Sequence, residues 1–398
     1  MWWMFAGCGS PAPTADAASG GVVVERSQGV EADLIRVNRF LDTRPKVERP
    51  IREAGVGELD AGGLSAESCG SCHPDQLDQW RLSVHAQAWV DRQFQAEIGK
   101  SDNRWLCLGC HTPLLVQQDR WPVGLVDGDV ERPHLIDAPV YDAALRDEGI
   151  TCAACHLRDG VIHGPGLPDS TSPHAVVADP DFRGPGLCLG CHQAEEVFPD
   201  KGFVCTFQTG EEWQRSPWSS QGGCPVCHMP EQQAPAAKGG PVRTVRAHWW
   251  KGAGIAKIPG KYPPPEANRP GLALALARDG DAVAVTTTNA NAGHMLPTGD
   301  PERWVQVVVR FLAGDTPVGE PVTLRFGQTW EWVTPPRKVA DNRLAPLESR
   351  VQRIPIPKGA TRVEAVGSSH RISVENAAYH HLDGYPTSVE THRMTLDL

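Results

Sequence analysis

The sequence predicts a mixed fold, in which a loop-rich domain of short helices is followed by an all-β domain. The pattern Cys-x-x-Cys-His occurs five times between Cys69 and His228. Glycine (40) and proline (35) are both numerous among the 398 residues, as expected of a chain with short elements and many loops. From about Gly271 onward, short β-rich runs separated by Gly, Pro and Asp replace the motifs, which predicts an antiparallel, immunoglobulin-like sandwich.

The repeated motif is typical of c-type haem attachment. Its two thiols would form thioether bonds to the haem vinyl groups, and the adjacent histidine would be the proximal ligand of the iron. Zinc sites and disulfides also use paired cysteines, but neither requires a histidine after every second cysteine. We therefore predict a multihaem c-type cytochrome domain with five covalently bound haems. The attachment residues are Cys69, Cys72, Cys107, Cys110, Cys152, Cys155, Cys188, Cys191, Cys224 and Cys227, and the proximal ligands are His73, His111, His156, His192 and His228.

The composition changes along the chain and divides it into four segments. The first residues are apolar, and the next stretch is rich in Ser, Gly, Pro and Ala, which is typical of a flexible tether. A proline-rich stretch at 258–265 separates the motif region from the β-rich region. We predict a signal remnant at 1–8, a tether with an extended N-terminal segment at 9–60, the haem domain at 61–262 and the β-sandwich domain at 263–398.

The apolar start ends in Phe5-Ala6-Gly7-Cys8, which resembles the end of a bacterial lipoprotein signal with Cys8 as the lipidated residue. Its hydrophobic part is too short for a complete signal peptide and lacks a basic start. Covalent haem attachment takes place outside the cytoplasm, so the motifs also imply export. We expect a protein of the periplasm, the outer membrane or the cell surface. Any membrane attachment would be through Cys8, because no later segment has the ~20 apolar residues of a membrane span.

The formal net charge of −10, before any haem propionates are added, bears on the partners. A nucleic-acid partner is not expected, since phosphate binding requires a basic face. Basic or neutral redox proteins fit better. We expect the partners to be other cytochromes, a quinol-oxidising complex or a terminal reductase, and the sequence does not choose among them.

The β-rich region begins with a hairpin signal. Two runs, 272–277 and 281–288, flank the turn-like Arg278-Asp279-Gly280. No cysteine follows Cys227, so this region attaches no haem. Further strands are expected at 304–312, 321–326, 347–356 and 361–366.

The number of axial histidines decides the function. Of the 15 histidines, five belong to the motifs, which leaves ten. A haem with a second histidine is low-spin and suited to electron transfer, whereas an open sixth position can bind and transform a small molecule. The ten remaining residues are His85, His134, His163, His174, His248, His294, His370, His380, His381 and His392.

Residues 64–300 resemble the multihaem cytochrome c-554 type family, which is related to hydroxylamine oxidoreductase-like cytochromes. The matching stretches are Cys69-x-x-Cys72-His73 with Trp80-x-x-Ser83-x-His85, Glu148 to His156 with His163-Gly164, Cys224 to Pro230, Arg246 to Gly252 and Asn291 to Gly299. The resemblance implies five distal ligands, namely His85, His163, His174, His248 and His294. His134 is the reserve candidate, and His370, His380, His381 and His392 are expected to be ordinary surface or strand residues.

Three functions follow from these features. The favoured one is an exported cytochrome that transfers electrons between redox partners through five bis-histidine haems, with no catalytic residue. The second is a multihaem oxidoreductase that acts on a small nitrogen or sulfur compound at one five-coordinate haem. The supply of distal histidines argues against it, and the absence of a Cys-x-x-Cys-Lys motif argues against the nitrite reductase pattern. The third is a subunit of a cytochrome filament.

Overall fold

The computed structural model describes residues 61–398 except 101–103, 129–131, 159–160, 167–173, 175, 199–202, 251 and 264–268. The predictions for segments 1–8 and 9–60, with the lipidation of Cys8, fall outside the described residues. The chain divides into two compact units, which we describe separately. The first runs up to Cys191 and includes Gly223–Trp250, and the second consists of His192–Gly222 and Lys251–Leu398.

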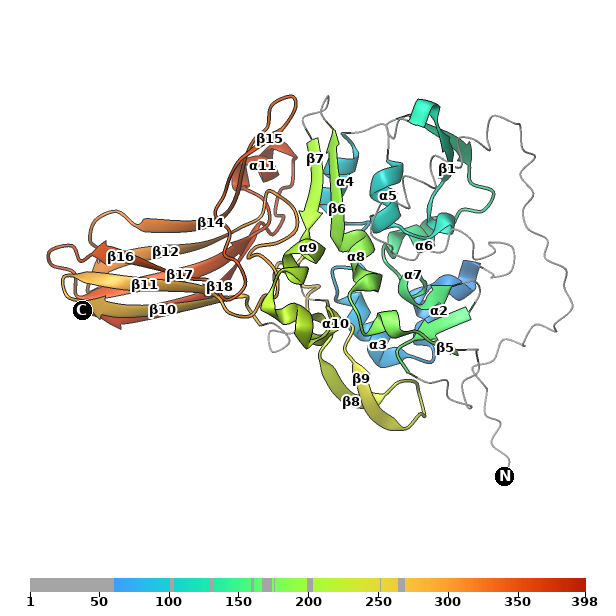
Figure 1. The fold of residues 1–398 in the computed structure, drawn as a ribbon, viewed down its shortest axis with the longest axis horizontal. Coiled ribbons are helices and arrows are strands. Elements are labelled where there is room, and N and C mark those ends of the chain that lie inside the picture. The colour runs from blue at the N-terminus through green and yellow to red at the C-terminus, as the bar shows by residue number, and fades with distance from the viewer. Residues whose placement is uncertain are drawn as a thin grey trace, which may run out of the picture. The chain divides into compact units, whose positions relative to one another are not determined.

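Short elements make up the first unit (Figure 1). None of its described helices exceeds eight residues. Side chains of Ser65, Asp91 and Asp142 accept hydrogen bonds from backbone N–H groups and begin three of the helices, α2, α4 and α6. The helices are α2 (Ala66–Gly70), α3 (Pro74–Arg81), α4 (Arg92–Ile98), α5 (Trp105–His111), α6 (Ala143–Asp147), α7 (Cys152–His156), α8 (Gly186–His192, which ends in the second unit) and α10 (Pro225–His228), and the 3₁₀ turns are Ala61–Leu64, Leu115–Gln117, Val126–Gly128 and Pro180–Phe182.

Three small sheets complete this unit. Strand β1 (Arg120–Leu125) pairs antiparallel with β2 (Pro133–Asp137), and β8 (Glu231–Pro235) pairs antiparallel with β9 (Val242–Arg246). A third sheet has the order β3-β4-β5, with the bounds Leu157–Arg158, Val161–Gly164 and Val176–Ala178.

Each Cys-x-x-Cys-His motif lies on a helical turn, as the sequence predicts. The histidine is the last residue of α5, α7, α8 and α10. In the first motif, Cys69 lies in α2 and His73 is the residue before α3, where Pro74 begins the next helix. Because residues three apart are neighbours on a helix, this conformation puts both thiols of a motif on one side.

The apolar side chains of the first unit form several small clusters. One joins Leu64, Leu114 and Leu145 with the two alanines of α7, another is Leu77 with Trp80 and Ala66, and a third is Phe94 with Ile98 and Leu108. A domain normally has one contiguous core. Several small clusters bury less apolar surface than one such core would in a unit of this length. A large apolar group between the clusters would supply the missing contacts.

In the second unit, the described strands from residue 272 onward form two antiparallel sheets. One has the order β10-β11-β16, and the other has the order β15-β14-β12-β17-β18, with β13 paired to β12 (Figure 1). The strands are β10 (Leu272–Asp279), β11 (Ala282–Asn289), β12 (Trp304–Ala313), β13 (Thr316–Pro317), β14 (Val322–Glu331), β15 (Arg337–Asp341), β16 (Ser349–Pro355), β17 (Arg362–His370) and β18 (Ser388–Asp397), and helix α11 (Val374–Tyr379) precedes the last strand.

One core lies between these two sheets. Alternate residues of β11 and β12 are buried, as expected of strands with one face inward. Val283 and Val285 from the smaller sheet join Val307 and Val309 from the larger one in a single cluster. The predicted fold class, a loop-rich region of short helices followed by antiparallel β-structure, is confirmed.

The predicted strands are present with small shifts at their ends. In the hairpin, Asp279 pairs with Ala282, so the two-residue turn is Gly280-Asp281, one residue later than predicted. Gly280 has a φ of 64°, which favours glycine. Strands β15 and β18 and helix α11 were not predicted. Strand β15 is exposed throughout, and β18 alternates half-buried with exposed residues but has none that is fully buried, so its signal is weaker than that of a core strand.

The segment His192–Gly222 belongs with the β-rich unit, although the sequence prediction places it in the haem domain. It contains strand β6 (Gln193–Phe198), paired with β7 (Phe203–Gln208), and helix α9 (Thr209–Gln214), followed by a 3₁₀ turn at Pro217–Gln221. Glu212 of α9 forms an ion pair of 2.6 Å with Arg343, and both side chains are buried. Gly293 leaves room for Trp213 and Trp218, since a Cβ atom there would lie 3.3 Å from Trp218 Cβ.

A histidine in β17 makes the stability of this unit depend on pH. The His370 ring stacks on Trp304 with ring centroids 4.4 Å apart, and its Nε2 lies 2.8 Å from Ser368 Oγ. Burial, with a smaller contribution from the charge of Arg325, lowers the pKa of His370 from 6.5 to about 4. A depressed histidine pKa means that the unfolded chain binds the proton first, so stability is lost as the pH falls from 6.5 towards 4.

We predict that His370→Phe removes this loss while it keeps an aromatic ring against Trp304. Between pH 7 and pH 4, the free energy of unfolding of the wild type should fall by about 1–3 kcal/mol more than that of the variant, after discounting for the partial exposure of the ring. Urea denaturation of both proteins at several pH values measures this. A difference that stays constant across the window would contradict the prediction.

Candidate haem sites

The predicted attachment cysteines are accessible in the structure. Nine of them are reduced thiols, and all nine are partly or fully exposed. Free cysteine is normally one of the most buried residue types. The exposure therefore fits sites that a large group would fill. The tenth, Cys72, is in a disulfide, so a thioether at Cys72 would require the reduced thiol.

Thiols of different motifs lie close together in the first unit. Side-chain hydrogen bonds join Cys69 with Cys152, Cys188 with Cys224, and Cys110 with Cys191. The contact with Cys69 and burial raise the pKa of Cys152, which keeps it a neutral thiol. Electrostatic interactions also connect Cys155 with Cys188 and Cys191. All five motifs thus form one connected set.

Backbone carbonyls fix the orientation of three predicted proximal histidines. The Nδ1 atom lies 2.6 Å from Ala236 O in His73, 2.9 Å from Ala88 O in His111 and 2.8 Å from His163 O in His156. A carbonyl can only accept a hydrogen bond, so Nδ1 carries the proton in each ring. The Nε2 lone pair is then available to a metal, which is the arrangement that metal-binding histidines usually have.

The predicted distal histidines show the same feature. The Nδ1 atoms of His248 and His294 lie 2.9 Å from the carbonyl oxygens of Arg246 and Met295. In His163 the partner is a carboxylate, because Nδ1 lies 3.2 Å from Asp179 Oδ2. A carboxylate at this position makes an imidazole a more basic ligand.

Predicted proximal and distal histidines are brought together in two places in the first unit. The ring centroids of His156 and His248 are 6.1 Å apart, and those of His73 and His174 are 6.3 Å apart. Two imidazoles that bind one metal ion from opposite sides, each with a metal–nitrogen distance of about 2 Å, have centroids about 6 Å apart. The centroid distances of both pairs match this value.

A third pair lies in the second unit. His192 and His294 are close enough to interact electrostatically. Burial, together with the charges of Arg303 and His294, lowers the pKa of His192 to about 4, although its side chain is accessible to water.

The comparisons with known proteins agree with this geometry. Residues 68–126, which contain the first two motifs, match the model of the family "Cytochrome c554 and c-prime". The chain is similar to the crystal structure of a penta-heme cytochrome c552 from Thermochromatium tepidum, with a TM-score of 0.59 and 19% sequence identity over 84% of this chain and 99% of that chain. No curated protein sequence matches it. The chain has the fold of a multihaem cytochrome c.

The resemblance expected from the sequence is thus confirmed, and the family match supports covalently bound c-type haem and electron transfer. The described residues include no group of three or more His, Cys, Asp or Glu side chains arranged to hold a metal ion by themselves. None of the described helices is long and apolar enough to cross a membrane.

The remaining histidines have different surroundings. The His85 ring lies 4.8 Å from that of Trp250. His228 is exposed at the end of α10, and His134 is exposed in β2. His370 and His392 lie in strands, while His380 and His381 follow α11.

Two aromatic features of the chain were not foreseen from the sequence. Phe94 stacks on His111 with ring centroids 3.6 Å apart and planes 2° from parallel, so it fixes the plane of a predicted proximal imidazole. The indole N–H of Trp218 is buried without a hydrogen-bond acceptor in the described part of the chain. A haem would bring carboxylates as acceptors, since each carries two propionates. Aromatic residues are common near any core, so neither feature has a specific signal in the sequence.

Proposed function

We propose that this cytochrome is an electron-transfer protein with five haems, each held by two thioether bonds and two axial histidines. The observation that carries the proposal is the spacing of His156 and His248, whose ring centroids are 6.1 Å apart with both Nδ1 atoms held by carbonyls. An iron with two histidine ligands has no open position for a substrate, so it is suited to electron transfer.

The observed contacts support the proposed axial pairs where such contacts exist. His73 pairs with His174, His156 with His248, and His192 with His294. The haems of His111 and His228 take His85 and His163 as their distal ligands. His163 lies only seven residues after His156 and its carbonyl accepts a hydrogen bond from the His156 ring, so it serves a different haem.

The contacts between motifs support a continuous path for electrons. Because thiols of all five motifs connect to one another, the haems attached to them would be close neighbours. Bound haem supplies the one-electron chemistry, and the protein tunes it through ligands, hydrogen bonds and nearby charges. Here the residues that hold the Nδ1 atoms keep each imidazole in place while the iron changes its oxidation state.

We further propose that the cytochrome works outside the cytoplasm, held to a membrane through a lipid on Cys8. Its net charge of −10 favours partners with a basic docking face, because attraction between opposite charges speeds the association of two proteins. Other cytochromes, a quinol-oxidising complex or a terminal reductase are the classes of partner that match this chemistry.

The intact mass of the denatured holoprotein tests the cofactor content. Covalent attachment predicts a mass excess of five haems that survives denaturation. A smaller excess would contradict the number of haems, and no excess would contradict attachment itself. Carbon monoxide added to the reduced native protein separates the two functions. We expect no spectral change, whereas a change equivalent to one haem would favour an oxidoreductase with one open site.

A further inference from the structure

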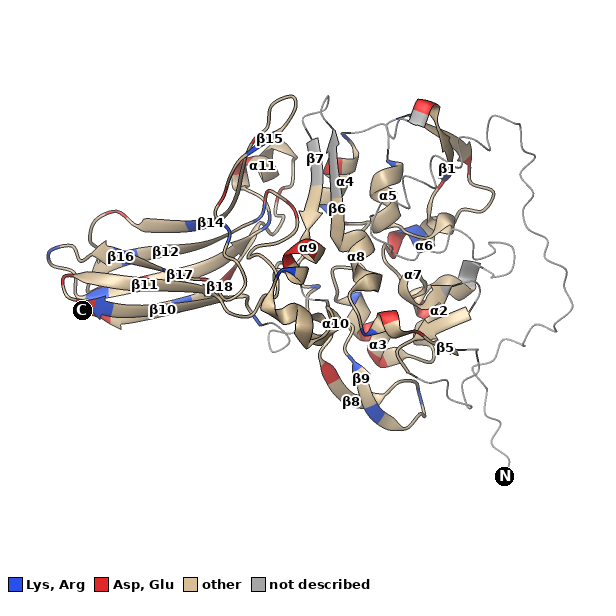
Figure 2. Ribbon diagram, viewed as in Figure 1, with Lys and Arg blue, Asp and Glu red and all other residues tan. Residues whose placement is uncertain are grey.

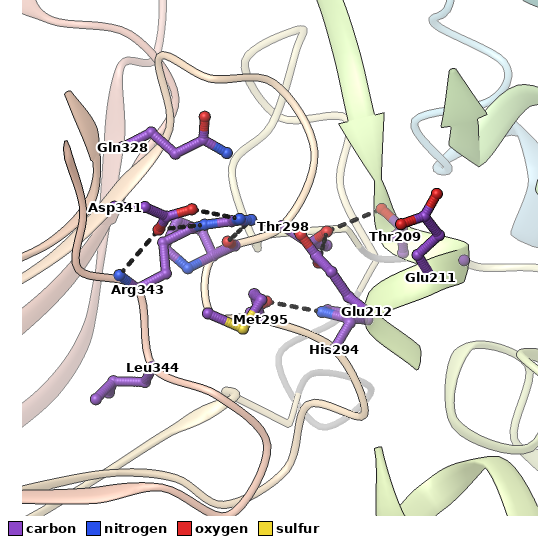
Figure 3. Close-up of polar contacts among 12 residues, drawn as sticks. Thr209, Glu211, Glu212, His294, Met295, Thr298, Gln328, Asp341, Arg343 and Leu344 are labelled. Atoms are coloured by element: carbon purple, nitrogen blue, oxygen red, sulfur yellow. Dashed lines mark hydrogen bonds and ion pairs between the residues drawn. The ribbon is translucent and has the colours of Figure 1, made fainter. Parts of the chain in front are cut away.

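A buried cluster of charged side chains lies next to the His294 loop in the second unit (Figure 3). Arg343 donates hydrogen bonds to Glu212 Oε1 at 2.6 Å and to Asp341 Oδ2 at 2.8 Å. The Arg343 and Glu212 side chains are only 7% and 8% exposed. Figure 2 shows the glutamates of α9 as an acidic stretch of that helix. Burying these charges is costly, and an apolar replacement of such a pair is often equally stable.

The cluster holds the residues that follow His294. Thr298 Oγ1 donates to Glu212 Oε2 at 2.6 Å, and Arg343 Nη1 lies 3.3 Å from Pro297 O. Leu344, the neighbour of Arg343, exchanges backbone hydrogen bonds of 2.9 and 3.1 Å with Leu296. The loop is therefore fixed along its whole length from residue 296 to 298.

A second contact fixes the ligand residue itself. Asn289, which is fully buried, donates its side-chain N–H to His294 O at 2.9 Å and to Leu344 O at 3.1 Å. The His294 Nδ1 atom lies 2.9 Å from Met295 O. These hydrogen bonds therefore fix both the ring and the backbone of His294.

The cluster also places charges near this ring. Glu212 and Asp341 are acidic, Arg343 is basic, and Lys338 Nζ lies 3.8 Å from Asp341 Oδ2. Asp341 is therefore paired with two cations, and Glu212 is the carboxylate whose charge acts on the His294 ring, opposed by the charge of Arg343. In a water-poor interior such interactions are screened much less than at the surface.

We propose that Glu212, Asp341 and Arg343 are positioning residues that hold His294 on its iron, and that the charge of Glu212 lowers the reduction potential of that haem. A negative charge favours the ferric state, which carries one more positive charge than the ferrous state. The proposal rests on the proposed function, because it takes His294 as an axial ligand.

Potentiometric titration of the holoprotein, followed by its haem absorbance, tests the charge effect. Glu212→Gln keeps the shape of the side chain and should raise the potential of one haem. We expect about a tenfold change in its ferrous-to-ferric ratio at a fixed potential, which is about 59 mV for one electron. Arg343→Met removes the positive charge and should lower the potential of the same haem. Glu211→Gln, an exposed neighbour on α9, is the control and should change nothing.

The opposite signs separate this role from a structural one. Loss of packing alone would move the potential in the same direction in both variants, and that result would overturn the proposal, as would no shift in Glu212→Gln. If Arg343→Met does not fold, Arg343→Lys replaces it. Lysine keeps the charge, so the potential should stay at the wild-type value, and a shift as large as that of Glu212→Gln would contradict the charge effect.

A further variant distinguishes failure of this proposal from failure of the proposed function. His294→Gly should convert one haem to the high-spin state if His294 is an axial ligand. A spectrum that stays low-spin would refute the ligand assignment itself. A high-spin haem in His294→Gly together with an unshifted potential in Glu212→Gln would refute only the role of the charged cluster.

Discussion

Replacement of His248 by glycine is expected to convert one haem from the low-spin to the high-spin state and leave the others unchanged. The His248 ring faces that of His156 at a centroid distance of 6.1 Å, and glycine offers no ligand in its place. The backbone should stay in position, because His248 N donates to Gln79 Oε1 at 2.7 Å and the preceding Ala247 is buried. Absorption and EPR spectra of the oxidised variant measure the change.

Two companion variants sharpen this test. His248→Met should keep the haem six-coordinate and raise its reduction potential, since a thioether ligand stabilises the ferrous state. His392→Gln removes an imidazole from β18, where no ligand is expected, and should leave every haem low-spin. A wholly low-spin spectrum in His248→Gly would remove His248 from the ligand set.

Loss of both thiols of the third motif should remove one haem from the protein. In Cys152→Ser/Cys155→Ser no thioether can form, so the mass excess of the denatured holoprotein should fall by one haem. We also expect a large loss of stability, because α7 contributes Ala153 and Ala154 to an apolar cluster that the haem would help to complete. Intact mass and thermal denaturation measure the two effects.

Cys205 provides the matched control for this experiment, since it lies in β7 outside every motif. Cys205→Ser should keep the full haem content. An unchanged mass in the double variant of the third motif would show that the haem there is held in another way, which would contradict covalent attachment through Cys152 and Cys155.

The helical turns at the motifs could be predicted because each motif is a contiguous pattern. A cysteine pair and a histidine within five residues need only one helical turn to be brought together, and the structure has such a turn at each motif. The strands around Val283 and Val307 could be predicted for a similar reason, since alternating burial leaves a local signal. Strand β18 has half-buried residues but none that is fully buried, so its signal in the sequence is weaker.

Contacts between distant segments could not be derived from the pattern. The partner of His156 depends on how the stretch after β9 returns to α7, and nothing within either segment specifies His248. The ion pair of Glu212 with Arg343 likewise joins α9 to the loop that follows β15. This contact helps to place His192–Gly222 in the β-rich unit. Whether two charged residues form a buried ion pair depends on the groups around them, and these come together only in the folded chain.

EPR of the fully oxidised protein, quantified against its haem content, tests the central claim most directly. We predict five low-spin ferric haems, one for each Cys-x-x-Cys-His motif, and no high-spin component, because every iron would have two histidine ligands. A stoichiometric high-spin signal would contradict this claim and show that one haem has an open position. The cytochrome would then be better described as an oxidoreductase for a small nitrogen or sulfur compound.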